Sequence, residues 1–346
     1  MMSMTREQAL LLHDDALVID SHNDSTVGHI RRGNLGLMGE SGAESRGPHV
    51  RPGAISALRQ FTPDQSVQLN IPKMRQGGLN AAVFAVDVTM AWGNHLLYAM
   101  DGVGYISAEV EYYAEQMTLA RSSGEILEAA KQGKIAALLA IENSDALERS
   151  LHVLQSFYQS GVRSITLTHS PRSWAADGCE VVGGGGLTAF GIDLVSEMNR
   201  LGMLIDVSHL NESGFWETLE NSKTPVIASH SCCRDLCDHP RNLTDAQLRR
   251  LADNGGVVGI TFVEPFVDPR DPTLERLLDH VEHAVNAAGI DHVGLGSDFD
   301  GGGDLIEDAT IYPELTAGLA ARGFADGDLR KILGLNHLRL LAETID

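Results

Sequence analysis

Positive charge is scarce in this sequence. Its 346 residues include 26 Lys and Arg against 47 Asp and Glu, which gives a formal net charge of −21. A chain this acidic repels nucleic acid and anionic membrane surfaces, so we expect neither as a partner. An anionic group on a substrate would need a local cation inside the binding site.

Long apolar runs are also missing. No run approaches the roughly 18 residues that are needed to span a bilayer. Near the N-terminus, the apolar residues 10–12 are followed directly by polar residues 13–15, which is unlike a signal peptide. We therefore expect a soluble protein of the cytoplasm.

Cysteine is rare, and its spacing excludes two classes of protein. The four cysteines are mostly clustered: Cys179, Cys232, Cys233 and Cys237. They form neither a Cys-x-x-Cys redox motif nor the second pair that a zinc finger requires. A disulfide framework is not expected in a reducing compartment. We interpret the cysteines as reduced thiols in a loop.

What the sequence does contain is a series of eight short apolar runs, which we predict to be strands. They are residues 18–24, 79–88, 135–141, 163–168, 203–208, 225–229, 257–262 and 292–297. Helical patterns lie between them and cover residues 103–131, 146–160, 188–200, 244–252 and 273–288, among others. Strands and helices that alternate in this number are typical of a (β/α)8 TIM-type barrel. A doubly wound open sheet is the alternative.

The predicted domain organisation is simple. We expect one barrel domain over residues 1–346. Residues 26–70 are polar and contain several glycines, and we interpret them as a long excursion over the active-site face after the first strand.

Metal-binding side chains stand at or just past the ends of these runs. They are His22, Asp24, Glu142, His169, His209, His230 and Asp298. In a barrel, the C-terminal ends of the strands converge on one face, where the active site lies. In an open sheet they would spread along a line. This convergence favours the barrel and predicts a single polar site.

The types of ligand favour two divalent ions. Hydrolytic two-metal sites hold ions about 3.5–4 Å apart between imidazoles and carboxylates. Alternate residues of a strand share a face, so His22 and Asp24 would bind one ion, and His209 and His230 the other. Glu142 offers two oxygens and would bridge them. Nitrogen and oxygen ligands without cysteine suit zinc first, with manganese, cobalt or iron as alternatives.

Several longer motifs surround the candidate ligands: His22-Asn-Asp24, Gly202-Met203-Leu-Ile-Asp-Val-Ser-His209, Ser229-His230-Ser231 followed by His239-Pro-Arg241-Asn242, Gly296-Ser-Asp298-Phe-Asp300-Gly301 and Gly334-Leu-Asn336-His-Leu-Arg339. Over most of its length, the chain shows through these motifs a resemblance to the membrane (renal) dipeptidase family of the amidohydrolase superfamily. This resemblance implies a binuclear zinc barrel that hydrolyses dipeptides and often tolerates a D-residue at the C-terminal position. It also implies the ligand sets given above.

The resemblance further implies roles for three residues. His169 would contact the scissile carbonyl, Arg241 would hold the substrate carboxylate, and Asp298 would handle protons. Hydroxide from a water bridging the ions would attack the carbonyl, while Asp298 accepts its proton and returns it to the leaving amine. Glu142, His169 and Asp298 are thus the catalytic candidates.

Two departures from the family pattern concern the substrate pocket. Glu142 is followed by Asn-Ser-Asp without the usual glycine-rich continuation, and His169 by Ser-Pro-Arg-Ser-Trp174 without the usual asparagine. Another amidohydrolase, such as an N-acyl-amino-acid deacylase or a lactonase, is therefore an alternative. A noncatalytic barrel that retains metal is a second one, although it would be expected to lack Asp298. A small dipeptide is the expected partner, and the sequence is compatible with a homodimer.

Overall fold

The structure is a computed structural model that describes residues 4–32, 35–39, 66–89, 94–301 and 306–346. Its parallel strands are β1 (Ile19–Asn23), β2 (Ala81–Asp87), β3 (Met117–Leu119), β4 (Ile135–Glu142), β5 (Val162–Thr166), β6 (Leu204–Asp206), β7 (Ile227–Ser231), β8 (Val257–Ile260) and β9 (Val293–Leu295). β1 pairs with β2 and β9, and β2 pairs with β4, so eight of these strands close into a ring. This confirms the (β/α)8 barrel and all eight predicted strands.

The ninth strand, β3, lies outside this ring and was not predicted from the sequence. It pairs with the first half of β4, and β5 pairs with the second half on the same edge. The single helix predicted over 103–131 is therefore wrong. The chain instead forms α4 (His95–Tyr112), then β3, then α5 (Ser123–Lys131). Ser122 starts the second helix because its side chain accepts a hydrogen bond from the backbone N–H of Glu125.

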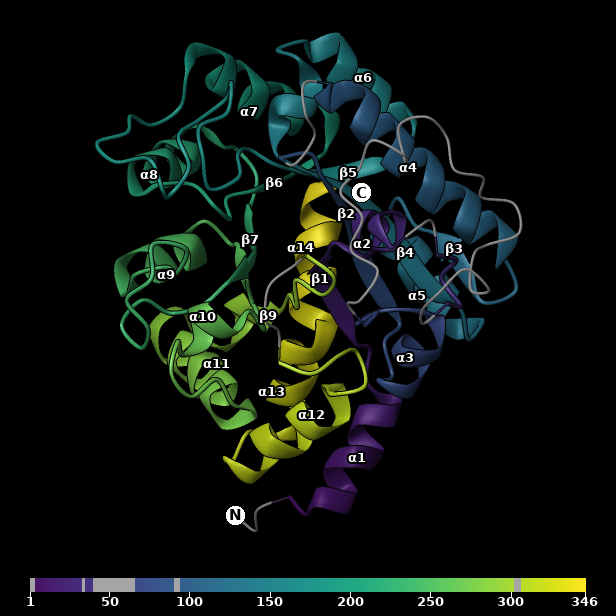
Figure 1. Ribbon diagram of the computed structural model, residues 1–346. Helices are drawn as coiled ribbons and strands as arrows, with labels where there is room; N and C mark the ends of the chain where they lie inside the picture. Colours follow the sequence, from purple (N-terminus) through teal and green to yellow (C-terminus); the bar gives the residue numbers. More distant parts are fainter. Residues whose placement is uncertain (1–3, 33–34, 40–65, 90–93, 302–305) are drawn as a thin grey trace.

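Helices surround the barrel (Figure 1). The others are α1 (Arg6–Asp15), α2 (Ser25–Arg31), α3 (Ile71–Gln76), α6 (Leu151–Gln159), α7 (Ala189–Leu201), α8 (Glu212–Asn221), α9 (Asp245–Asp253), α10 (Glu264–Val267), α11 (Leu274–Ala288), α12 (Tyr312–Ala321), α13 (Asp326–Arg330) and α14 (Asn336–Thr344). Among the helices predicted above, three begin at threonine N-cap residues: Thr188, Thr244 and Thr273. The helices predicted at these caps are confirmed.

The helix predicted over 146–160 is divided in two. A 3-10 turn, η3 (Ser144–Leu147), follows β4, and α6 begins only at Leu151. Between them, Glu148 and Arg149 have positive φ angles of 47° and 60°, which interrupt a right-handed helix. The apolar periodicity continues across the break and hides it in the sequence.

The predicted excursion of residues 26–70 lies partly outside the described residues, which exclude 33–34 and 40–65. Its two ends meet at Asp300, on the loop that follows β9. The Asp300 carboxylate accepts hydrogen bonds from the Ser25 hydroxyl at 2.7 Å and the Leu69 N–H at 3.1 Å, and it pairs with Arg32 at 3.0 Å. The extent of the excursion, its position over the site and the single domain over 1–346 stay predictions.

The C-terminal helix α14 closes the end of the barrel where the strands begin. Its Leu340 and Leu341 belong to a buried cluster with the first residues of several strands, such as Ile19 of β1 and Ile227 of β7. This end of the barrel is therefore lined mainly by apolar side chains. Only the opposite end, where the strands finish, is left for a polar site.

Candidate metal centre

Four of the predicted ligands meet at the C-terminal end of the barrel. Glu142 is the last residue of β4, His22 and His230 lie in β1 and β7, and His209 follows β6. The His209 Nε2 lies 2.8 Å from one Glu142 carboxylate oxygen, and the His230 Nε2 lies 3.5 Å from the same oxygen. All four side chains are buried. The sequence placed these residues on four separate strands, and the barrel brings them together.

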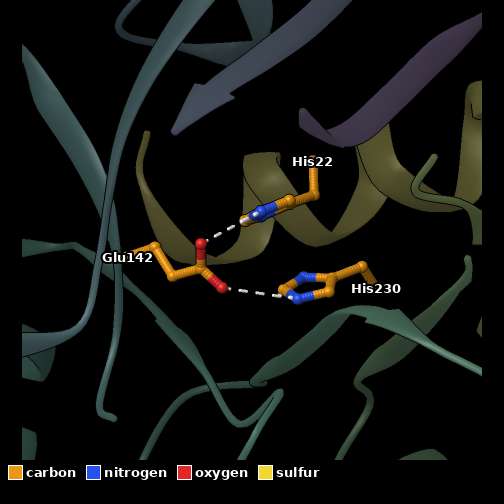
Figure 2. Close-up of side chains that lie close together, drawn as sticks. All are labelled: His22, Glu142 and His230. Atoms are coloured by element: carbon orange, nitrogen blue, oxygen red, sulfur yellow. Dashed lines mark ion pairs between the residues drawn. The ribbon is translucent and has the colours of Figure 1, made fainter. Parts of the chain in front are cut away.

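Glu142 directs its two oxygens to different histidines. Its Oε2 lies 3.7 Å from the His22 Nε2, while Oε1 faces His209 and His230. Figure 2 shows this division, with His22 on one side of the carboxylate and His230 on the other. A carboxylate in this position can bind one cation with each oxygen.

Asp24 and Asp298 join the His22 side of the site. Ligand atoms of His22, Asp24 and Asp298 all lie within 4.8 Å of one another. The His22 Nε2 and the Asp24 Oδ1 are buried and have no hydrogen-bond partner within the described residues. Buried polar atoms are almost always paired, because leaving one unpaired costs about 1–3 kcal/mol. Both orphaned atoms are good metal ligands, so the residues fit a divalent cation.

His169 lies at the mouth of the site. It follows β5, its side chain is 27% exposed, and its Nε2 is 3.9 Å from the Glu142 Oε1. Its ring stacks on His209 with 4.0 Å between the centroids. His169 also forms a compact group with Glu142 and His209, within 4.8 Å. This geometry allows contact with a substrate or with a cation bound at His209.

Arg241 reaches the site from the loop after β7. The side chain is buried, and its Nη2 donates a hydrogen bond of 3.0 Å to the His230 carbonyl oxygen. Its Nε and Nη1 have no hydrogen-bond partner within the described residues. Arg172 is different, because it is exposed and pairs with Asp177. A buried guanidinium with free N–H groups suits an anionic ligand.

The chain also matches a known family in sequence. The family profile described as membrane dipeptidase (peptidase family M19) matches residues 6–346. The chain belongs to the membrane dipeptidase family. This bears out the resemblance seen in the motifs.

Several relatives support the family membership. Dipeptidase verJ of Clonostachys rogersoniana is 40% identical over 247 residues, which cover 70% of this chain and 64% of that protein. Dipeptidase tcpJ of Claviceps purpurea is 33% identical over 305 residues, covering 83% of this chain and 72% of that protein. A metallopeptidase from Rhodobacter sphaeroides, solved with a phosphinate mimic of the dipeptide L-Ala-D-Ala, is 26% identical. Its TM-score is 0.81, over 95% of this chain and 99% of that one.

The carboxylates of the site favour positive charge on the neighbouring His22. Burial opposes a charge on His22, but Glu142 and Asp24 outweigh burial and raise its pKa to about 10. Burial, and then repulsion from Glu142, raise the pKa of Asp24 well above its usual value. Burial also disfavours the Glu142 anion, yet the neighbouring His22 and His209 hold its pKa well below the usual value. A divalent cation would satisfy the same demand.

The remaining groups have pKa values suited to their positions. Burial lowers the pKa of His209 and His230 well below the usual value, and the positive charge of Arg241 adds to this. Neutral imidazole is the form that binds a metal. Burial raises the pKa of Asp298 to about 7, with His22 opposing and Glu142 adding to the shift. A carboxyl group with this pKa can both accept and return a proton near neutral pH.

Two carboxylates next to the ligands were missed by the sequence analysis. Asp20 of β1 accepts hydrogen bonds from the Ser297 N–H at 2.9 Å and the Ser297 hydroxyl at 2.6 Å. Asp206 of β6 contacts the strand that carries His230. A signal for both exists, since an Ile-Asp pair stands just before the histidine in residues 19–22 and 205–209.

Asp87 is a third missed carboxylate at a strand end. It is the last residue of β2 and is paired in register with Glu142 of β4. Its Oδ2 lies 3.7 Å from the Nη2 of Arg31, on α2. The rule that found the other ligands, an acidic residue where a strand ends, would also have selected Asp87.

The other clusters do not resemble the site at the strand ends. Asp235, Asp245 and His283 form a compact group of possible ligands, but Asp245 is already paired with His283 at 2.7 Å and with Arg249 at 2.8 Å. All four cysteines are free, as expected from the sequence: Cys179, Cys232, Cys233 and Cys237. Burial raises their thiol pKa values, which disfavours a thiolate nucleophile.

Proposed function

We propose that this protein is a metal-dependent dipeptidase that hydrolyses the peptide bond of free dipeptides with two divalent ions, zinc being the first candidate. The observation that carries the proposal is the division of the Glu142 carboxylate between His22 on one side and His209 and His230 on the other. Membership of the membrane dipeptidase family supports the activity.

The ligands divide into two sets in this proposal. His22 and Asp24 would hold one ion, His209 and His230 would hold the other, and Glu142 would contribute one oxygen to each. Bound divalent cations lower the pKa of water to near neutrality and polarise a carbonyl oxygen. All five of these side chains are buried, which shields the site that they form from bulk water.

The surrounding residues act on the substrate. Asp298, beside His22 and Asp24, accepts a proton from the attacking water and returns it to the leaving amine. His169, at the mouth, donates a hydrogen bond to the oxygen of the scissile carbonyl. The free N–H groups of Arg241 bind the C-terminal carboxylate. Together these contacts set the distance from the carboxylate to the reacting carbonyl.

The substrate range includes dipeptides with a C-terminal D-residue. Support comes from the Rhodobacter sphaeroides metallopeptidase, whose ligand mimics L-Ala-D-Ala. The free N–H groups of Arg241 would recognise the C-terminal carboxylate, a group that L- and D-residues share.

We further propose that the protein acts in the cytoplasm. The support is its four unpaired cysteines, which fit a reducing compartment. Within the residues that the structure describes, no helix is both long and apolar enough to cross a membrane. The homodimer stays an untested expectation.

The test is a screen of metal-replete protein against a dipeptide library that includes D-residues, with N-acyl amino acids and lactones in parallel. Elemental analysis after dialysis should give close to two divalent ions per chain, and a chelator should abolish turnover. Zinc, cobalt or manganese should restore it. One ion with full activity would refute the binuclear site, and preferential hydrolysis of N-acyl amino acids or lactones would refute the dipeptidase assignment.

A further inference from the structure

A single buried carboxylate, that of Asp206, stands behind two of the proposed ligands. Asp206 ends β6, and its side chain accepts four hydrogen bonds. The Oδ1 accepts from the N–H groups of Ser208 and Ser229, both at 3.0 Å. The Oδ2 accepts from the Ser229 hydroxyl at 2.6 Å and the Thr166 hydroxyl at 2.8 Å. An ionised carboxylate can only accept, so the direction of all four bonds is fixed.

The Ser229 hydroxyl links Asp206 to His230 and His22, and the fixed donor and acceptor roles at Asp206 determine those at the two histidines. Its only proton is donated to Asp206, so its oxygen can only accept from other groups. The His230 Nδ1 lies 2.8 Å from this oxygen, and the His22 Nδ1 lies 3.4 Å away. Each imidazole thus places a proton on Nδ1. In the neutral form of each ring, the Nε2, which faces Glu142, then carries the lone pair that a cation needs.

We propose that Asp206 is a positioning residue that, through Ser229, fixes the Nδ1–H tautomer of His230 and His22 and thereby prepares both metal positions with one hydroxyl. The inference rests on the proposed function, in which these two histidines bind different ions. Groups that hydrogen-bond to a ligating histidine commonly change metal affinity about 10- to 100-fold when they are replaced.

Asparagine in place of Asp206 would reverse the chain of hydrogen bonds. Because Oδ1 faces two N–H groups, the asparagine must keep its oxygen there and place its NH2 group where Oδ2 was. That NH2 group would donate to the Ser229 hydroxyl, whose proton would then turn toward the His230 Nδ1. The proton of the neutral His230 ring would move to Nε2, and its lone pair would no longer face Glu142.

The test compares Asp206→Asn with Thr166→Val in the full chain. Thr166→Val removes a hydroxyl from the same Asp206 oxygen, and among the described residues this hydroxyl donates to Asp206 and not to an imidazole, so it is the matched control. We expect zinc affinity, measured by competition with a chromophoric chelator, to fall about 10- to 100-fold in Asp206→Asn and by less than about threefold in Thr166→Val. Equal affinities in the two variants would overturn the inference.

Imidazole nitrogen NMR of chelator-treated protein gives a readout that needs neither activity nor metal. The His230 proton should move from Nδ1 to Nε2 in Asp206→Asn and stay on Nδ1 in Thr166→Val. His280 is an internal reference, since its Nδ1 accepts from the Cys233 N–H at 3.1 Å and its Nε2 donates to the Val267 carbonyl oxygen at 2.9 Å, which fixes its tautomer. An unchanged His230 tautomer in Asp206→Asn would contradict the proposal.

Variants at Ser229 keep the inference testable if Asp206→Asn does not fold. Ser229→Ala should weaken zinc binding by a similar factor, and Ser229→Thr, which keeps the hydroxyl, should restore it. Failure of this inference is distinguishable from failure of the proposed function. A wild-type chain that binds no divalent ion would refute the function, whereas two bound ions with unchanged affinity in the variants would refute only the role of Asp206.

Discussion

At the scale of single residues, the backbone is unusual where the candidate site residues stand. His209 and Asp298 have positive φ angles of 69° and 67°. His and Asp enter this left-handed region more readily than most residues, but it still costs roughly 1–3 kcal/mol for each. Both follow strand ends, where the chain turns sharply and directs the side chain back into the site. The hydrogen bonds around them hold this conformation.

Asp298 provides the first test at this scale. Asp298→Asn keeps the shape of the side chain but cannot accept a proton, so kcat should fall by about 100-fold or more. Metal content, measured by elemental analysis, should stay at the wild-type value. Loss of an ion in this variant would instead make Asp298 a ligand, which its distance from His22 and Asp24 also allows.

Arg241 separates a dipeptidase from a general amidohydrolase. A hydrogen bond to a charged group is worth about 1.5–3 kcal/mol, so Arg241→Met should lower kcat/KM for free dipeptides by about 10- to 100-fold. Activity on dipeptide amides, which lack the carboxylate, should barely change.

The matched control for Arg241→Met is Arg172→Met. Arg172 is an exposed arginine that pairs with Asp177, so its removal should leave kcat/KM for dipeptides unchanged. An equal loss on amides and free dipeptides in Arg241→Met would show that the arginine is structural, through its bond to the His230 carbonyl. A large loss in Arg172→Met would move carboxylate recognition to that residue.

At the scale of elements, side chains add hydrogen bonds to barrel strands that are short. β6 and β7 share a single register pair, Asp206 with Ile227. The Asp206 carboxylate extends this short ladder by accepting from the Ser229 N–H. At the opposite end, α14 closes the barrel, and its His337 Nε2 lies 3.2 Å from the Leu295 N–H. Gly294 makes room for this ring, since a Cβ there would lie 2.2 Å from it.

The contact of His337 with β9 predicts that the free energy of unfolding decreases in acid. Burial lowers the pKa of His337 to about 4, against about 6.5 in an unfolded chain. The neutral ring therefore contributes its full stabilisation above about pH 6.5. This stabilisation is lost as the pH falls through 4. The free energy of unfolding of the wild type should decrease between pH 7 and pH 4.5. In His337→Gln this decrease should be smaller by about 2–3 kcal/mol.

Urea unfolding at both pH values, with chelator present throughout, measures this difference. Glutamine keeps an amide near the Leu295 backbone but does not titrate, so it isolates the charge of the ring. Identical pH dependence in the two proteins would mean that water reaches His337 and that α14 does not seal the barrel.

At the scale of the whole molecule, a net charge of −21 surrounds a site that requires cations. The field of the protein favours the approach of divalent metal and opposes an anionic substrate. The buried Arg241 and the partly buried Arg31, which pairs with Asp87, offset that repulsion locally. The ligands come from strands far apart in sequence, so metal binding joins the two halves of the barrel and should raise its thermal stability.

Metal binding should also release protons. His22, whose pKa is raised to about 10, is protonated at pH 8 and must lose that proton to bind a cation. Zinc affinity should therefore rise with pH up to about 10, the pKa of His22. Calorimetry at pH 8 in two buffers of different ionisation enthalpy should report at least one proton released per chain. A binding heat that is independent of the buffer would show that His22 is neutral or is not a ligand.

The sequence by itself determined the barrel and the residues offered to the site. Apolar runs set the eight strands, the period of two put His22 and Asp24 on one face, and the parallel arrangement brought the strand ends together. It missed β3 and the break before α6, because apolar periodicity continues through both. Local patterns cannot reveal a strand of three residues that forms only against β4.

Only the tertiary structure decided which partner each of these residues contacts, and therefore which role it can take. The two oxygens of Glu142 face different histidines, Arg241 keeps free N–H groups while buried, and Asp206 directs the Ser229 hydroxyl. Each of these depends on distances between strands that are remote in sequence. The register and closure of the barrel set those distances, and hydrogen-bond direction, which follows from them, is not encoded in any single segment.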